Sequence, residues 1–389
     1  MVHTHRPALK AFSMGLAMSK EQELRGNESM VQMNELAFYT LAGAPESPRD
    51  LIDEVGHGER LGLGSVFISE RFNIKEAATL SGAVGAVSHR LGVATAATNH
   101  NTRHPMVTAA HAMTMHKLTE GRFSLGLGRG IGPMFDAYGL QRIKTSQIED
   151  FVGLLRRIWR GETVVQHDGP CGTFPYLSMG AEYNEHIPMT FTAFGPNSLA
   201  LGGRAFDAVV LHTFFTEETT RRCVSQVKAA AEKAGRDPEH VKVWSCFAVV
   251  GDHLSEAVRL KKLVGRMATY LQAYGDLMIK TNDWDPEVLA RFRKDEFVKN
   301  FRGAIDNLAS TKELEHVATL IPEEWLASAA TGSMESCVRS INEQFDMGVD
   351  GVILHGASPE QLQPIVEHYR EQRISDRFVR MTNNPGGIA

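Results

Sequence analysis

Residues that could carry out chemistry gather in an eight-residue segment, 98–105, with the sequence TNHNTRHP. His100 and His104 lie on either side of Arg103 there. Histidine exchanges a proton near neutral pH and arginine carries a fixed charge, so such a segment can supply an acid, a base or a hydrogen-bond donor. A solvated loop is the alternative for any one of these side chains. We expect His100, and then His104, to be the first candidates for proton transfer.

A second segment, 126–133, is rich in glycine and has the sequence GLGRGIGP. The dinucleotide-binding pattern G-x-G-x-x-G fails in it, because Ile131 or Pro133 occupies the third glycine position. Glycines let a ligand approach the backbone closely, and Arg129 adds a positive charge. We therefore favour a ligand-binding loop here over a tight connection between two elements.

A third segment, 195–198, has the sequence GPNS and precedes a helical stretch over 199–204. The amide groups of a helix N-terminus favour a phosphate or another anion. An ordinary Asn or Ser cap explains the same sequence equally well.

Five of the sixteen histidines fall within 89–116, which raises the question of a metal site. His111 and His116 are five residues apart and therefore lie on different faces of a helix. A third ligand at compatible spacing, with carboxylates close by, is not visible. We predict no metal site.

The composition excludes several classes of protein. The 41 Lys and Arg residues stand against 46 Asp and Glu residues, so the chain has no surplus of positive charge for a nucleic acid. No apolar run approaches the roughly 18 to 20 residues of a membrane span, and the N-terminal stretch does not read as a signal peptide. The four cysteines form no CxxC pair. We expect a cytoplasmic protein with reduced thiols that acts on a small molecule.

The elements that must position these segments alternate along the chain. Short apolar runs with β-forming residues are separated by helical patterns, which is typical of parallel βα units. Eight strands are predicted, at 35–42, 65–69, 91–98, 122–128, 187–194, 207–212, 241–250 and 350–355. Eight strands each followed by a helix indicate the α/β class and a (β/α)8 TIM barrel, with a doubly wound open sheet as the alternative. The candidate segments then follow strands 3, 4 and 5, at the carboxyl ends where such barrels bind their ligands.

Several boundaries follow from helix signals and from length. Ser47 and Pro48 predict the start of a helix that runs to about Leu61, Pro105 opens one that runs to Leu118, and Ser358 and Pro359 open the last. We divide the chain into an N-terminal arm (1–34) and a single barrel domain (35–389). The barrel carries a hairpin insertion at 162–186 and a helical insertion at 252–332. The tail 383–389 is expected to be poorly specified.

The strand-end segments together resemble those of a known family. SVFISERF (65–72), LGVATAATNHNTRHP (91–105), LTEGRFSLGLGRG (118–130) and TAFGPNSLALGGRAFDAVVLH (192–212) occur in the order found in the bacterial luciferase-like oxidoreductases. The sequence is most similar to the branch of that superfamily that uses the deazaflavin coenzyme F420. The resemblance implies a (β/α)8 barrel with insertions, and commonly a homodimer.

The resemblance also implies roles for particular residues. The cofactor ring is expected across the carboxyl ends of the strands, supported by a non-prolyl cis peptide that matches Ala94 and Thr95. Glu70 matches an acidic cofactor contact and is the third candidate for proton transfer. The expected cofactor contacts are Glu70, Ala94, Thr95, Thr98, Asn99, Gly128, Arg129, Gly130, Gly195, Pro196, Asn197 and Ser198. Arg71 and Arg103 are expected to hold an anionic group of the substrate or cofactor.

Two departures from the family's dehydrogenases bear on the substrate. Those enzymes place a histidine directly after the acid, where this chain has Arg71, and an acid at the position of Ile131. Glucose 6-phosphate is therefore not expected as the substrate. The leading hypothesis is an F420-dependent oxidoreductase that transfers a hydride to or from a carbonyl, alcohol, enone or imine compound. The alternatives are an FMN-dependent monooxygenase supplied with reduced flavin by a partner reductase, and a barrel that binds flavin without catalysis.

Overall fold

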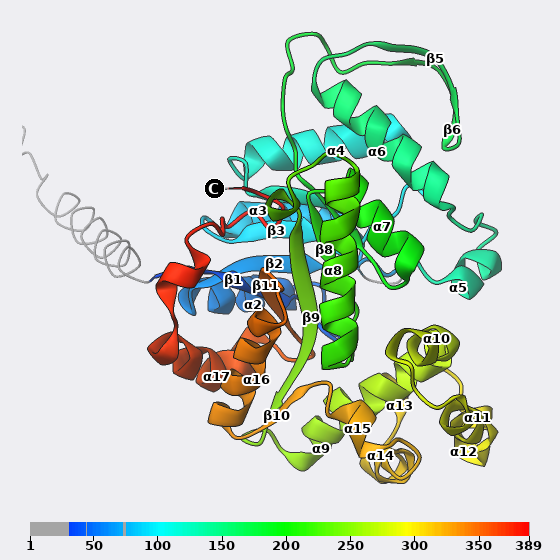
Figure 1. Ribbon diagram of the computed structural model, residues 1–389, viewed down its shortest axis with the longest axis vertical. Coiled ribbons are helices and arrows are strands. Elements are labelled where there is room, and N and C mark those ends of the chain that lie inside the picture. The colour runs from blue at the N-terminus through cyan, green and yellow to red at the C-terminus, as the bar shows by residue number, and fades with distance from the viewer. Residues whose placement is uncertain (1–30, 44, 73–74, 389) are drawn as a thin grey trace, which may run out of the picture.

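Eight parallel strands close into a barrel in the computed structural model, which describes residues 31–43, 45–72 and 75–388 (Figure 1). The order around the barrel is β1, β2, β3, β4, β7, β8, β9 and β11, and β11 pairs with β1 to complete the ring. Their bounds are Met33–Tyr39, Leu63–Ile68, Gly92–Thr95, Phe123–Leu127, Met189–Thr192, Ala208–Val210, Lys242–Gly251 and Gly351–His355. The predicted TIM barrel is therefore confirmed, and each of the eight predicted strands overlaps one of these.

The strands are buried on both faces, as their continuous apolar sequences require. Inside the barrel, Phe67, Trp244 and Ile353 pack with small residues such as Ala37 and Ala94. The interior is thus a packed core, and ligands are confined to its ends.

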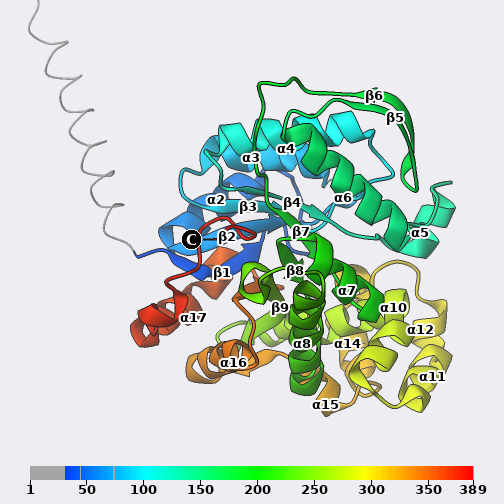
Figure 2. The same ribbon diagram turned by 45° about the horizontal axis from the view of Figure 1, so that its top comes forward.

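Helices cover the outside of the barrel (Figures 1 and 2). They are α2 (Asp50–Arg60), α3 (Ala77–Val87), α4 (Pro105–Leu118), α5 (Gly132–Ala137), α6 (Thr145–Trp159), α7 (Pro196–Ala205), α8 (Glu217–Lys233), α16 (Met334–Asp346) and α17 (Pro359–Gln372), with short 3-10 turns η1 (Pro238–His240) and η3 (Ser375–Phe378). The start signals of α4 and α17 are confirmed, and Ser358 caps α17 in a capping box. The predicted start of α2 at Ser47 and Pro48 is wrong. The Ser47 hydroxyl accepts the amide hydrogen of Arg49 in a turn, and the helix begins at Asp50.

The first insertion is an antiparallel hairpin of β5 (Val164–Gly169) and β6 (Gly172–Leu177), which lies along α6 (Figures 1 and 2). The second gathers at the other end of the molecule and is helical. It comprises α9 (Glu256–Leu260), the π-helical η2 (Lys261–Gly265), α10 (Arg266–Asn282), α11 (Pro286–Lys294), α12 (Glu296–Asn300), α13 (Ile305–Leu308), α14 (Thr311–Ala318), α15 (Glu323–Leu326) and the short strand β10 (Ala330–Gly332), which pairs with β9. These helices have an apolar cluster of their own, in which Trp284 and Trp325 stack with ring centroids 4.5 Å apart.

Both termini differ from expectation where the structure describes them. The predicted arm falls mostly on 1–30, outside the described residues, and Met33 and Asn34 already belong to β1. The tail is well packed, so its prediction as a poorly specified terminus is wrong. The Asn384 side-chain amide donates to the carbonyls of Gly121 and Phe123, and the Trp244 indole donates to the Pro385 carbonyl. The tail therefore covers the amino-terminal end of the barrel.

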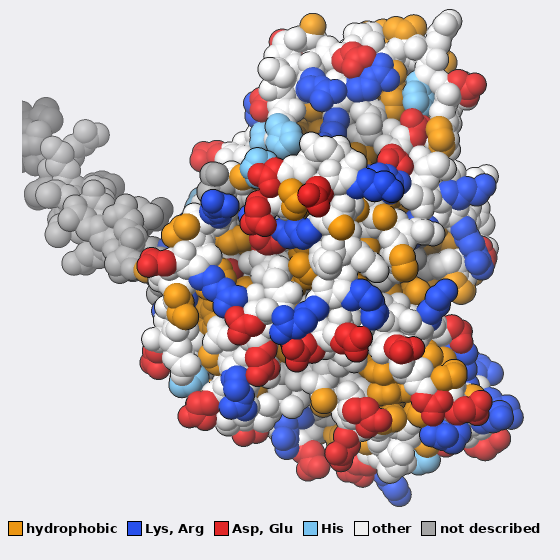
Figure 3. Space-filling view, in the orientation of Figure 1, with side chains coloured by type: hydrophobic (Ala, Val, Ile, Leu, Met, Phe, Trp, Pro, Cys, Tyr) orange, Lys and Arg blue, Asp and Glu red, His pale blue; other side chains and the backbone are white. Residues whose placement is uncertain are grey.

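The sequence also led us to expect no surplus of positive charge and no membrane-spanning segment. Figure 3 shows Lys and Arg side chains interspersed with Asp and Glu over the visible face. Among the described helices, none is both long and apolar enough to span a membrane.

Candidate active site

The carboxyl end of β2 leads to a buried carboxylate at the centre of a hydrogen-bond network. Arg103 donates to both oxygens of Glu70, at 2.5 and 3.3 Å, and the Thr98 hydroxyl donates to Glu70 Oε2 at 2.8 Å. The Asn99 amide reaches the same oxygen at 3.4 Å. The structure therefore brings together four residues that the sequence placed at the site. Glu70 and Arg103 thus already have partners within the protein.

Arg103 has a second carboxylate partner, Glu76, directly before α3. The Glu76 side chain also accepts the amide hydrogens of Ala78 and Thr79, and these bonds together with Arg103 hold its pKa at about 2 against the cost of burial. The loops after β2 and β3 are thus tied to each other and to the start of α3. The arginine spans two anions of the protein itself.

The two candidate histidines of the same loop lie in different surroundings. His100 is buried with its ring centroid 5.6 Å from that of Phe151 on α6, and burial lowers its pKa to about 4. His104 is exposed and caps α4, since its Nδ1 accepts the Met106 amide hydrogen. Its ring meets Phe174 of the hairpin edge to face, with centroids 5.2 Å apart. The structure therefore does not bring these two histidines to a common point.

A cis peptide follows β3, but not where it was expected. Ala94 and Thr95 lie inside the strand, and the Thr95 hydroxyl is bonded to Gly126 of β4. The cis bond joins Ala96 and Ala97, so the expected position was wrong by two residues. Next to it, a methyl group at Gly128 would come within 2.5 Å of the Thr192 hydroxyl and 2.9 Å of the Ala97 side chain. Small residues therefore form a closely packed surface at the ends of β3, β4 and β7.

The other cofactor candidates follow the same strands. Arg129 bonds the Thr145 hydroxyl, while its Nε is buried without a hydrogen-bond partner among the described residues. Gly130 has a positive φ of 65°, and a side chain there would collide with the Phe135 ring. Helix α7 begins directly at Pro196 with Gly195 as its N-cap, and Asn197 and Ser198 lie in its first turn. This helix N-terminus suits an anion.

A cavity of about 560 Å³ opens beside the Glu70 network. Its lining includes the cations Arg71 and Arg103, Lys75 from the loop before α3, and the carboxylates Glu70 and Glu76. Burial, followed by the charges of Arg71 and Arg266, lowers the pKa of Lys75 to about 7. Arg103 is paired with both carboxylates and Lys75 bonds the Leu41 carbonyl, so the exposed Arg71 is the cation of this lining that would attract an anionic group.

A cluster of aromatic and histidine side chains occupies the carboxyl ends of β1, β8 and β11. His355, at the end of β11, bonds the Tyr270 hydroxyl through Nε2 at 3.1 Å and lies edge to face against Tyr39. His212, after β8, lies with its ring centroid 4.8 Å from that of Tyr270 and 4.3 Å from that of Phe194. Helix α10 of the insertion therefore supplies part of the barrel mouth.

Both histidines of this cluster are neutral at pH 7. Burial lowers the pKa of His212 to about 4 and, with the nearby Arg266, lowers the pKa of His355 well below its ordinary value. His212 Nδ1 lies 3.0 Å from the Thr213 carbonyl, so Nδ1 carries the hydrogen and Nε2 is left as an acceptor. His355 Nδ1 is buried with no partner in the described part of the chain. These nitrogens are the polar groups at the mouth that a ligand could satisfy.

Arg71 joins the cavity to this cluster. It lines the cavity, and its charge lowers the pKa of His355 and opposes the rise that burial causes in the pKa of Tyr270. Arg71 therefore lines the cavity beside the Glu70 network and is near enough for its charge to act on His355 and Tyr270.

The sequence reasoning missed His212, His355, Tyr270 and Tyr39 as candidates. The first two stand directly at the ends of predicted strands, and that position was the signal that could have selected them. Tyr270 gave no such signal, because it lies 85 residues from His355 within the insertion.

Comparison with known proteins adds findings on the sequence and on the fold. The sequence model of the family described as luciferase-like monooxygenase matches residues 29–351. The chain is 24% identical over 316 residues, 79% of its length and 91% of the relative's, to 5,10-methylenetetrahydromethanopterin reductase of Methanolobus tindarius. It is 23% identical to F420-dependent glucose-6-phosphate dehydrogenase of Segniliparus rotundus, with 84% of this chain and 93% of that relative covered.

A solved structure has the same fold. The coenzyme F420 dependent tetrahydromethanopterin reductase from Methanopyrus kandleri superposes with a TM-score of 0.72 at 16% identity, over 87% of this chain and 99% of that one.

Proposed function

Because the chain belongs to the luciferase-like monooxygenase family, we propose that it is an oxidoreductase that uses coenzyme F420 to transfer a hydride to or from an organic substrate. The relative from Segniliparus rotundus and the solved structure from Methanopyrus kandleri are named as F420-dependent enzymes, and the relative from Methanolobus tindarius is named as a reductase of a methanopterin. The observation that carries the proposal is the barrel mouth, where buried nitrogens of His355 and Arg129, at the ends of β11 and β4, have no hydrogen-bond partner among the residues that the structure describes.

The residues present fit a deazaflavin. Ala97, Gly128 and Thr192 pack closely at the ends of β3, β4 and β7, and side chains this small would let a flat ring approach the backbone there. Arg129 and the N-terminus of α7 would hold the acidic part of the cofactor, from Gly195 to Ser198. When bound, the 5-deazaflavin supplies a hydride acceptor and donor that does not activate oxygen.

The chain's own task is then to orient the substrate and to handle one proton. The Nε2 of neutral His212 can accept a proton as an alcohol is oxidised, and the same protonated nitrogen can return it when a carbonyl is reduced. The Tyr270 hydroxyl, beside the His212 ring, can orient the substrate oxygen. The bond between Tyr270 and His355 fixes the direction of that hydroxyl. We give Glu70 and Arg103 a positioning role in place of the proton transfer and anion binding expected from sequence, because they are bonded to each other.

The substrate proposal follows from the charges of the cavity. The exposed Arg71 favours a carbonyl, alcohol, enone or imine compound that carries an anionic group. The description of the family as monooxygenases favours the second candidate, FMN with reduced flavin from a partner reductase. A homodimer stays a prediction that rests on the family resemblance.

Side-by-side titration of the protein with F420 and FMN tests the cofactor. We expect F420 to bind at least tenfold more tightly, and Gly128→Ala to weaken it. Tight FMN binding with oxygen consumption would instead favour the monooxygenase. A protein that binds either cofactor but turns over no compound of the four classes would be the non-catalytic barrel.

A second experiment tests the proton route with whichever substrate turns over. His212→Gln and Tyr270→Phe should lower kcat at least tenfold and change its pH profile, with F420 affinity kept. His240→Gln, at an exposed turn, is the matched control. Unchanged pH profiles in both variants would remove His212 and Tyr270 from the proposal.

A further inference from the structure

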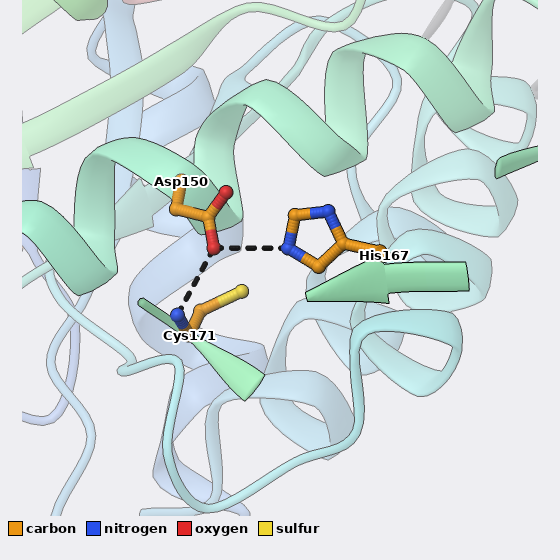
Figure 4. Close-up of side chains that lie close together, drawn as sticks. All are labelled: Asp150, His167 and Cys171. Carbon is orange, nitrogen blue, oxygen red and sulfur yellow. Dashed lines mark hydrogen bonds and ion pairs between the residues drawn. The ribbon is translucent and has the colours of Figure 1, made fainter. Parts of the chain in front are cut away.

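Three side chains of metal-ligand type converge where the β5 and β6 hairpin meets α6. Asp150 comes from α6, His167 from β5 and Cys171 from the hairpin tip, and one ligand atom of each lies within 4.8 Å of the others (Figure 4). The His167 Nε2 is 3.1 Å from Asp150 Oδ2, which also accepts the Cys171 amide hydrogen at 3.0 Å. Among the described residues, this is the group that combines three such ligands.

The hairpin tip is built closely around these atoms. A methyl group at Gly169 would come within 2.4 Å of His167 Nε2 and 2.5 Å of Asp150 Oδ2. Phe174 stacks on the His167 ring with centroids 6.0 Å apart and a tilt of 19°. The three ligands are only partly buried, so solvent reaches the group.

The simpler function for this arrangement is a hydrogen-bond clamp. In a clamp, Asp150 contacts the His167 ring and accepts hydrogen bonds from the Cys171 backbone amide and thiol. A divalent cation uses all three, because its charge offsets a carboxylate and a thiolate while a neutral imidazole completes the set.

We propose that Asp150, His167 and Cys171 bind one Zn²⁺, with water as the fourth ligand. Zinc accepts oxygen, nitrogen and sulfur together at about 2.0 to 2.3 Å, which places tetrahedral ligand atoms roughly 3.3 to 3.8 Å apart. A separation at the 4.8 Å limit would therefore need to shorten by about 1 to 1.5 Å, whereas the 3.1 Å between His167 Nε2 and Asp150 Oδ2 would lengthen slightly. The sequence did not reveal the site because Asp150 lies 17 residues from His167 and 21 residues from Cys171. These residues meet only when the hairpin folds against α6.

The metal would fix the hairpin to the barrel. An isolated two-stranded hairpin is marginally stable, and this one packs through Phe174 against both His167 and His104. His104 directly follows Arg103 of the Glu70 network. Zinc would thus hold the hairpin tip against the loop that borders the candidate active site, independently of which cofactor binds there.

Metal binding by the purified full chain tests the proposal. Chelator-treated protein should take up one Zn²⁺, and Co²⁺ in its place should give the near-ultraviolet absorption of a thiolate bound to cobalt. Cys171→Ser should abolish that absorption and weaken zinc binding by more than about 100-fold, beyond the 10- to 100-fold that loss of an outer partner costs. Cys337→Ser, at a buried cysteine outside the group, is the control and should leave both unchanged.

Thermal unfolding separates binding from a merely structural role. Zinc should raise the Tm of the native chain and of Cys337→Ser, but not that of His167→Gln or Asp150→Asn. Variants that lose stability equally with and without zinc would show a hydrogen-bond clamp only. Absence of stoichiometric zinc, or cobalt absorption that survives Cys171→Ser, would overturn the proposal.

Discussion

Glu70 and Glu76 bond the same arginine but differ in exposure. The side chain of Glu70 is 3% exposed and that of Glu76 is 49% exposed, while both contact Arg103 Nη2. Glu70→Gln should lower the free energy of unfolding by about 3 kcal/mol, because it leaves part of a buried ion pair uncompensated. Glu76→Gln should cost less, about 1 to 2 kcal/mol, because water screens its ion pair while its side chain also caps α3. Urea unfolding of both variants measures the contrast.

The contrast also separates positioning from catalysis at this pair. If Glu70 only holds the loop, turnover lost in Glu70→Gln should come with a less stable, less well ordered site and an unchanged pH profile. Equal destabilisation by the two variants would contradict the role of burial.

For single residues, the sequence predicted which side chains lie close together better than it predicted what each of them does. It selected Glu70, Thr98, Asn99 and Arg103 for one site, and the structure bonds them to one another. Their mutual pairing was not predictable, because it depends on the path of the loops after β2 and β3. His355 and Tyr270 meet only once the insertion has folded over the barrel mouth.

At the scale of elements, two glycines give opposite predictions. Gly128→Ala, at the end of β4, should cost about 1 to 3 kcal/mol of unfolding free energy, because its methyl group would press on Thr192 and Ala97. Gly153→Ala, within α6, should add about 0.5 to 1 kcal/mol, because alanine loses less backbone entropy and its methyl group would meet no described atom within 4 Å. Denaturant midpoints of the two variants should move in opposite directions. A stabilising Gly128→Ala would contradict the close packing of the small surface.

The strands were predictable because each is buried on both faces and therefore reads as a continuous apolar run. Helix starts were predictable where proline or a serine cap sits at the first turn, as in α4 and α17. The signal failed at Ser47, where the same residue types form a turn before α2. No regular spacing in the sequence indicated that Asp150, His167 and Cys171 would lie close together.

At the scale of the whole molecule, we expect the stability of the barrel to depend on the C-terminal tail that packs against its amino-terminal end. The Asn384 amide donates to the carbonyls of Gly121 and Phe123, which border β4 at the amino-terminal end of the barrel. Asn384→Ala should lower the free energy of unfolding by about 2 kcal/mol or more, because it leaves buried carbonyls unpaired. Asn300→Ala, exposed at the end of α12, should change it by less than about 0.5 kcal/mol. Equal stability of the two variants would show that the tail does not close the barrel.

Acid should destabilise the whole molecule through its buried histidines. Burial lowers the pKa values of His100, His111 and His212 from 6.5 to about 4. Below pH 6.5 the unfolded chain therefore binds more protons than the folded one, so the free energy of unfolding falls as pH decreases from 6.5 towards 4. One such group accounts for about 2 kcal/mol between pH 7 and pH 5, since each pKa unit corresponds to about 1.4 kcal/mol.

His100→Phe tests this dependence at a single group. Phenylalanine keeps an aromatic ring against Phe151 but cannot bind the proton, so the loss of stability between pH 7 and pH 5 should shrink by about 1 to 2 kcal/mol. Any fixed packing cost of the substitution is the same at both pH values and cancels in the difference. His240→Gln, at an exposed position, should leave the pH dependence as it is in the native chain. Urea unfolding at pH 7 and pH 5 measures this change in the free energy of unfolding. If His100→Phe loses as much stability as the native chain, His100 is protonated in the folded protein as readily as in the unfolded one.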